Sequence, residues 1–191
     1  MRKLILFMAL AFCGVVAMAQ RFEPKWVGEV AVLDCSADTV MIPTEKANVQ
    51  VKTSNSAGRI LFDIGNVRRK IIVKGGRSTT QLRAGEPIYL VVKCKDNETD
   101  PSGFIQVVRF EEKKKERRSE LAKVNWLDNV TQGNMDFVPY TADAYGRRSY
   151  LLRIEPQEGE FGVRILNPDE VDEKMPIFYC FGVHADDSDQ Q

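Results

Sequence analysis

The residue best suited to acid–base chemistry in this chain is its single histidine, His184. A Ser-His-Asp or Cys-His site would have to use this imidazole, because histidine is the base that activates the nucleophile in both arrangements. His184 follows the apolar run IFYCFGV and precedes an acidic terminus, a position typical of a surface residue at a strand end. GxSxG, HExxH, P-loop and GxGxxG motifs are absent, and VKGGRS at 73–78 has the composition of a turn. We therefore expect no catalytic residue and no cofactor.

Paired carboxylates are the second chemical possibility, because glycoside hydrolysis needs only two acidic side chains at a suitable separation. Glu158 and Glu160 form one candidate pair, and Asp169, Glu170 and Asp172 form a second group. Both groups lie in segments that resemble acid-rich turns, where solvated surface charge is a sufficient explanation. A hydrolase that acts on extracellular polymers is therefore the alternative to a non-enzymatic protein.

Of the four cysteines, Cys13 lies within the apolar N-terminal segment that is predicted below to be cleaved, and Cys35, Cys94 and Cys180 each lie in or at the end of an apolar run typical of a strand. Three cysteines in the mature chain leave at least one thiol unpaired within it. Cys35 and Cys94 are the preferred disulfide pair if the protein is exported to a compartment that permits disulfides. Three buried, inert thiols are the alternative. The sequence has no CxxC motif and no Cys/His cluster, so we expect no structural zinc site.

Thr39 is a candidate modification site. The tripeptide Asp38-Thr39-Val40 is similar to an Asp-Ser/Thr-apolar pattern that carries O-glycosylation in some exported bacterial proteins. An ordinary strand start is the alternative explanation for these three residues.

Basic residues are concentrated in KKKERR, at 113–118, which is a composition found in segments that bind nucleic acid. Acidic residues interrupt this run, and between Arg109 and Lys123 seven basic residues accompany four acidic ones. The whole chain has 27 basic and 27 acidic residues, so no overall charge attracts a polyanion. We expect no nucleic-acid partner.

The elements that must position these residues are β-strands. Apolar and polar residues alternate with a period of two in short runs such as NVQVKT, PIYLVVKC and EFGVRIL, and segments rich in Gly, Asn, Asp and Ser separate the runs. The sequence predicts an all-β fold, an antiparallel β-sandwich of about ten strands that is Ig-like or jelly-roll-like, with little helix. Residues 127–147 alternate weakly, and we expect a long loop there.

The charged stretch FEEKKKERRSEL, at 110–121, could form a helix or a hairpin. A helix over 111–120 has no apolar face and makes one favourable and four like-charged contacts between residues four apart. We therefore predict a long charged hairpin over 104–125, with a polar tip that projects past the body. With Lys114-Lys115 at the tip, opposite charges face each other across the strands in four pairs: Lys113–Glu116, Glu112–Arg117, Glu111–Arg118 and Arg109–Glu120.

The two ends of the chain differ from the rest. Residues 1–19 combine Arg2 and Lys3 with an apolar core and an Ala-Met-Ala ending, which is the pattern of a secretory signal peptide. We expect a single β-sandwich domain over 20–184 and an acidic disordered tail over 185–191. No transmembrane segment is expected after cleavage, and the mature protein is predicted to lie in the periplasm, outside the cell or at its surface.

The segments GEFGVRIL and IFYCFGV resemble the closing strand pair of a loose group of exported bacterial proteins with no assigned activity. The resemblance implies an antiparallel β fold and implies no catalytic or binding residue. We therefore predict a non-enzymatic exported protein with a structural, adhesive or ligand-binding role, whose partner is an envelope protein or a glycan. An accessory subunit of an envelope assembly is a further alternative.

Overall fold

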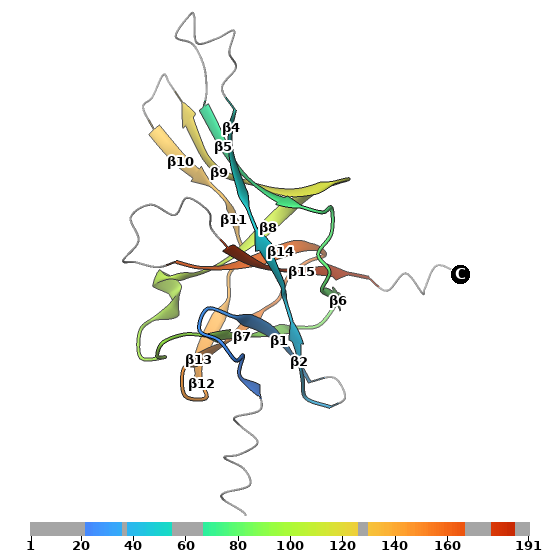
Figure 1. Cartoon of the computed structure of the whole chain (residues 1–191), viewed down its shortest axis with the longest axis vertical. Coiled ribbons are helices and arrows are strands. Elements are labelled where there is room, and N and C mark those ends of the chain that lie inside the picture. The colour runs from blue at the N-terminus through green and yellow to red at the C-terminus, as the bar shows by residue number, and fades with distance from the viewer. Residues whose placement is uncertain (1–21, 36–37, 55–66, 126–129, 167–176, 186–191) are drawn as a thin grey trace, which may run out of the picture. The chain divides into compact units, whose positions relative to one another are not determined.

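The computed structural model describes residues 22–35, 38–54, 67–125, 130–166 and 177–185, which form strands β1 to β15 and a short 3₁₀ turn, η2 (Pro101–Gly103) (Figure 1). The predicted all-β, antiparallel fold is confirmed, and it is compatible with a sandwich or a barrel-like arrangement. One pairing, β6 with β15, is parallel. Among the residues that the structure describes, no helix is long and apolar enough to cross a membrane. The predicted signal peptide (1–19) and nearly all of the predicted tail (186–191) lie outside the described residues.

The chain divides into two compact units, which are described separately. Unit 1 lies within residues 1–43, 88–101 and 141–153, and unit 2 lies within residues 44–87, 102–140 and 154–191. The expectation of one domain over 20–184 stays a prediction.

Unit 1 is a five-stranded sheet in the order β12-β13-β7-β1-β2. Its central strands are rich in β-branched and other apolar residues, and the ladder pairs Val30 with Val92 and Val32 with Leu90. All four of these side chains are buried, so the apolar runs of the sequence are core strands of this sheet. The strands are β1 (Val30–Asp34), β2 (Val40–Pro43), β7 (Ile88–Lys93), β12 (Thr141–Tyr145) and β13 (Ser149–Ile154).

Unit 2 is a sheet in the order β3-β15-β14-β8-β9-β5-β4, with β6, β10 and β11 attached to β15, β9 and β8. β3 and β4 stand at opposite ends of this order, yet only Val49 separates them in the chain. The sheet therefore curls until it almost closes into a small barrel. Its strands are β3 (Glu45–Asn48), β4 (Gln50–Ser54), β5 (Val67–Lys74), β6 (Gln81–Arg83), β8 (Ile105–Lys113), β9 (Glu116–Asn125), β10 (Val130–Asn134), β11 (Asp136–Phe137), β14 (Gly159–Ile165) and β15 (Ile177–His184).

An apolar core fills the inside of this barrel. The rings of Phe110 and Phe178 meet edge to face, with centroids 5.5 Å apart. Gly162 makes room for both rings, because a Cβ at this position would lie 2.6 Å from Phe110 and 2.9 Å from Phe178. The core cluster consists of Ala47, Val49, Ile71, Val73, Val108, Phe110, Phe178 and Cys180.

The predicted hairpin is confirmed in its turn and in the register next to the turn. β8 and β9 pair Glu111 with Arg118 and Lys113 with Glu116. Closer to its base the hairpin forks: Arg109 pairs with Asp136 of β11, and Glu120 pairs with Asn134 of β10. Residues 127–147, predicted as a loop, thus supply three strands. β10 and β11 each pair with one strand of the fork, and Met135, between them, packs on the barrel core.

The prediction of a projecting polar tip is wrong. β5 pairs with β9 as far as Glu116, and the N–H of Gly75 donates a hydrogen bond to the carbonyl of Lys115 at 3.0 Å. The predicted charge pairs also rearrange, because residues two apart on a strand share a face. Lys113 pairs with Glu111, and Arg118 pairs with Glu116.

Candidate functional site

One end of the barrel interior holds a layer of charged side chains, the barrel-end cluster, which is made up of Glu45, Glu112, Arg117, Glu160 and His184. Ladder partners point to the same side of a sheet, so each of these residues continues a row of inward-facing core residues. On β8, Phe110 and Glu112 are two residues apart and therefore point to the same side. Between neighbouring strands, the ladder pairs Val73 with Arg117, Phe110 with Glu160, and Cys180 with Glu45.

Arg117 stands at the centre of the cluster, and its side chain is 0% exposed. Its guanidinium donates to Oε1 of Glu45 at 2.7 Å and reaches Oε2 of Glu160 at 3.5 Å. The remaining donors contact the backbone carbonyls of Lys74 at 3.3 Å and Gly75 at 3.2 Å. Two carboxylates and two carbonyls therefore hold one buried cation in a fixed orientation.

Glu160 is also 0% exposed, and both of its carboxylate oxygens are engaged. Oε2 accepts a hydrogen bond from the N–H of Ser78 at 2.7 Å, and Oε1 accepts one from Nε2 of Gln81 at 3.1 Å. Oε1 also lies 3.2 Å from Nε2 of His184. A Cβ on Gly182 would come within 2.4 Å of both Gln81 and Glu160, so this glycine makes the arrangement possible.

The segment VKGGRS, expected to be a turn, covers the cluster. Besides Ser78, its neighbour Thr79 donates its N–H to Oε2 of Glu45 at 2.8 Å. Burial raises the pKa of Glu45, but hydrogen bonds from Arg117, Thr79 and Ser78 outweigh burial and lower that pKa overall. Glu45 is therefore ionised at neutral pH. The carboxyl groups of Glu45 and Glu160 thus share one guanidinium, that of Arg117.

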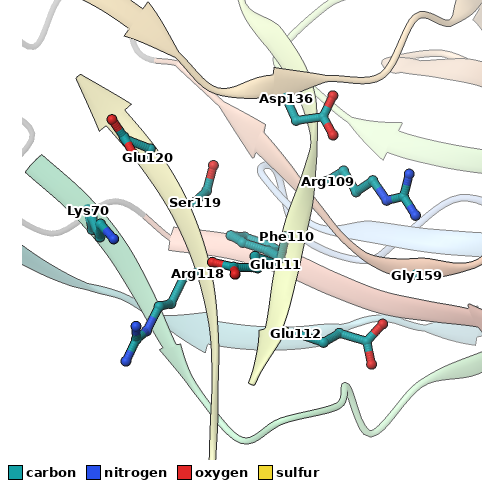
Figure 2. Close-up of a pocket in the computed structure, with 10 residues that line it drawn as sticks. All are labelled: Lys70, Arg109, Phe110, Glu111, Glu112, Arg118, Ser119, Glu120, Asp136 and Gly159. Carbon is teal, nitrogen blue, oxygen red and sulfur yellow. The ribbon is translucent and has the colours of Figure 1, made fainter. Parts of the chain in front are cut away.

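A pocket of about 400 Å³ lies where β8 and β9 separate (Figure 2). Figure 2 shows its lining residues grouped along these two strands, with others on β5 and β11. Seven of the ten lining residues are charged, three of them basic and four acidic. The pocket is lined by Lys70, Arg109, Phe110, Glu111, Glu112, Arg118, Ser119, Glu120, Asp136 and Gly159.

Two acidic side chains of the pocket, Glu111 and Glu120, differ in their hydrogen-bond partners. The side chain of Lys113 donates to Glu111, and this hydrogen bond lowers the pKa of Glu111 despite an opposing effect of burial. Oε1 of Glu120 is buried, and no group among the described residues donates a hydrogen bond to it. The lining of the pocket thus includes the carboxylate of Glu111, whose pKa is lowered, and that of Glu120, one oxygen of which is buried without a donor among the described residues.

The residues singled out in the sequence lie in different parts of the structure. His184 ends β15 and contacts Glu160, so it belongs to the barrel-end cluster. The acid pair Glu158 and Glu160 is split: Glu158 is exposed, whereas Glu160 is not in a solvated turn but inside the barrel. Arg117 was expected on the surface of the hairpin and is buried. Asp169, Glu170 and Asp172 lie outside the described residues.

The three cysteines outside the predicted signal peptide are free thiols, so the disulfide between Cys35 and Cys94 is not formed in this structure. Cys35 is exposed, while Cys94 and Cys180 are buried. Burial raises the pKa of Cys94 to about 11 and that of Cys180 to about 12. The alternative of buried, inert thiols therefore holds for these two and fails for Cys35. Thr39 is exposed just before β2, and its O-glycosylation stays a prediction.

Comparison with known proteins identifies no relative. No protein-family model matches the chain, and no curated protein or solved structure matches it. The resemblance carried by GEFGVRIL and IFYCFGV therefore stays a prediction, and the function must be argued from the geometry alone.

Proposed function

We propose that this protein is an exported, non-enzymatic binding protein that holds a polyhydroxylated ligand, a glycan, in the pocket between β8 and β9. The observation that carries the proposal is the mixed lining of the pocket, in which three cations and four carboxylates surround about 400 Å³ of space. Export is the expectation raised by the signal-peptide pattern of residues 1–19.

A sugar suits this lining because each hydroxyl group both donates and accepts hydrogen bonds. Arg109, Arg118 and Lys70 offer donors, and the carboxylates offer acceptors. A protein partner would instead be anchored by exposed aromatic and aliphatic side chains. The pocket's one aromatic residue, Phe110, is only 3% exposed.

Two features favour binding over the alternative of hydrolysis. A glycosidase needs one carboxylic acid whose pKa is raised so that it can protonate the leaving group. In this pocket the pKa of Glu111 is shifted in the opposite direction. Glu160, the buried carboxylate, accepts hydrogen bonds from Arg117, Ser78 and Gln81, and it does not line this pocket.

The test is a glycan array probed with the mature chain, followed by titration of each ligand found. Glu120→Gln and Lys70→Met each remove a charge from the pocket, and we expect each to weaken binding about tenfold, since a charge-assisted hydrogen bond contributes about 1.5–3 kcal/mol. Glu86→Gln and Lys46→Met make the same changes at exposed positions outside the pocket and should bind like the wild type.

An array without any bound glycan would contradict the proposal. Binding that survives both pocket variants would place the glycan elsewhere on the protein. Capture of an envelope protein by the wild type and by both pocket variants alike would favour the accessory-subunit alternative.

A further inference from the structure

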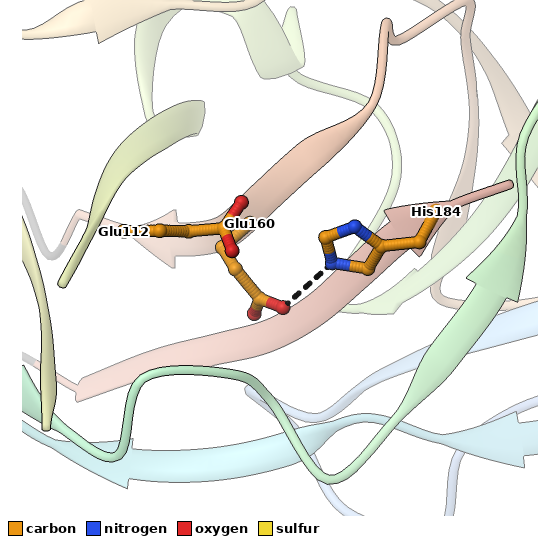
Figure 3. A group of neighbouring side chains, drawn as sticks. All are labelled: Glu112, Glu160 and His184. Atoms are coloured by element: carbon orange, nitrogen blue, oxygen red, sulfur yellow. Dashed lines mark hydrogen bonds and ion pairs between the residues drawn. The ribbon is translucent and has the colours of Figure 1, made fainter. Parts of the chain in front are cut away.

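Three side chains of the barrel-end cluster converge from three different strands (Figure 3). Glu112 comes from β8, Glu160 from β14 and His184 from β15, and one potential ligand atom of each lies within 4.8 Å of the others. Figure 3 shows the carboxylate of Glu160 directed at the imidazole ring, with Glu112 beside it.

Carboxylates outnumber arginine side chains around this point. Glu45, Glu112 and Glu160 contribute three carboxylates, and Arg117 contributes the buried guanidinium. The side chain of Arg77 approaches Glu112 at 3.9 Å but is 63% exposed, so solvent screens this pair. A cation bound here would interact favourably with the buried carboxylate of Glu160.

We propose that Glu112, Glu160 and His184 form a binding site for a divalent transition-metal ion, with Zn²⁺ as the preferred ion. Nε2 of His184 and Oε1 of Glu160 are 3.2 Å apart. This is close to the separation of about 3.3 Å expected for two ligands that each lie about 2.0–2.1 Å from one tetrahedral ion. In the bound state the imidazole carries its proton on Nδ1 and offers the lone pair of Nε2 to the ion.

Glu160 is oriented for this role by groups that the ion need not displace. Oε2 is occupied by Ser78 and Arg117, whereas Oε1 accepts one hydrogen bond from Gln81. A carboxylate oxygen has two lone pairs, so Oε1 can keep Gln81 and bind the ion with the other. Hydrogen-bonded ligating carboxylates of this kind are characteristic of metal sites in proteins.

The donor set decides which ion is expected. One imidazole nitrogen and two carboxylate oxygens suit Zn²⁺, and a divalent first-row site generally prefers Zn²⁺ over Mn²⁺ or Fe²⁺. Ca²⁺ takes six to eight oxygen ligands and is not suited to a site with a nitrogen ligand. The ion has access from solvent, because the side chains of His184 and Glu112 are 20% and 36% exposed. Water would complete its coordination.

The test is isothermal titration of the untagged mature chain with Zn²⁺ at neutral pH, repeated with Ca²⁺. We expect one Zn²⁺ per chain and at least tenfold weaker binding of Ca²⁺. Glu112→Gln should weaken Zn²⁺ binding at least tenfold, and its exposed position protects the fold. His184→Gln should also weaken Zn²⁺ binding at least tenfold, and the glutamine amide can still donate a hydrogen bond to Glu160.

Two variants are controls. Glu111→Gln removes the same charge from the neighbouring position on the opposite face of β8, and Cys35→Ser removes the exposed thiol. Both should bind Zn²⁺ like the wild type. The proposal is overturned if the wild type binds no Zn²⁺ at millimolar concentration, or if Glu111→Gln or Cys35→Ser weakens binding as much as Glu112→Gln. It is also overturned if Glu112→Gln leaves binding unchanged. Glycan binding is a separate measurement, so either proposal can fail alone.

Discussion

The barrel-end cluster predicts a large loss of stability in the variant Arg117→Met. Methionine preserves an unbranched side chain that can pack inside the barrel, but it removes the cation that faces Glu45 and Glu160. Both carboxylates would then lose their arginine partner, because Arg117 lies 2.7 Å from one and 3.5 Å from the other.

The expected cost is about 3–5 kcal/mol, the range observed when one partner of a buried ion pair is removed. The free energy of unfolding of a whole protein is about 5–15 kcal/mol, so this single change would remove a large part of the stability of the chain. The adjacent variant Arg118→Met is the matched control. Its side chain is 38% exposed and pairs with Glu116 at the surface, so we expect a loss below about 1 kcal/mol.

The pH dependence separates the charge effect from a packing defect. Glu45 has a pKa below its ordinary value of 4.5, so its contribution in the wild type is complete above pH 4.5 and is lost as the pH falls through the lower, folded value. Without Arg117, two of the contributions that lower the pKa of Glu45 are lost, so this pKa rises relative to the wild type. The variant should therefore lose less stability than the wild type on acidification, so the difference between the two proteins narrows towards pH 4.

The assay is thermal unfolding followed by circular dichroism between pH 4 and pH 8, with calorimetry to establish whether the transition is two-state. Arg117→Met within about 1 kcal/mol of the wild type at pH 7 would refute the reasoning. So would a difference that stays constant with pH, since that result would assign the loss to packing.

Three other predictions follow from single contacts. Gly162→Ala places a methyl group against two core rings and should destabilise the protein by about 1–3 kcal/mol in the same assay. Gly103→Ala meets no atom within 4 Å and should be nearly neutral, so equal losses would contradict this packing argument. An alkylating reagent at pH 8 should label Cys35 in the folded protein and leave Cys180 unlabelled until the protein unfolds. Mass spectrometry of timed samples measures the two labelling rates, and equal rates would contradict the burial of Cys180. Glu23→Gln removes the carboxylate that pairs with Lys93 and weakens the acceptor for two backbone N–H groups. It should lower the free energy of unfolding by about 1–3 kcal/mol above pH 4.5 and by less below that pH. A loss that does not change with pH would rule out a role for the charge of Glu23.

The hairpin shows how far sequence reasoning reaches. Opposite charges around Lys114-Lys115 predicted the register of β8 and β9 near the turn, because facing residues in a hairpin are set by distance from the tip. The fork at Arg109 could not be predicted in this way. It depends on β10 and β11, whose weak alternation gave no sign of strands and which are held in place by Met135 on the barrel core.

The barrel-end cluster was missed for a related reason. Glu160 alternates with Phe161, so the sequence placed it on the face opposite an apolar one, which normally means solvent. In unit 2 both faces of β14 are buried, and Phe161 and Glu160 are 1% and 0% exposed. The available signals were a glutamate near the start of an apolar strand, at Glu160, and the paired glycines of VKGGRS. Neither signal identifies the residue that Glu160 contacts.

The sequence alone therefore determined the all-β class, the strands with clear alternation and the turn of the charged hairpin. These features arise from side-chain periodicity and turn chemistry, which act between residues close in the chain. Closure of the sheet between β3 and β4, the fork that makes the pocket, and the contacts of Arg117 with Glu45 and Glu160 and of Glu160 with His184 were decided only by the tertiary structure. They join residues that are distant in the chain, such as Glu45 and Arg117, which are 72 positions apart. No local pattern records which distant strands will become neighbours.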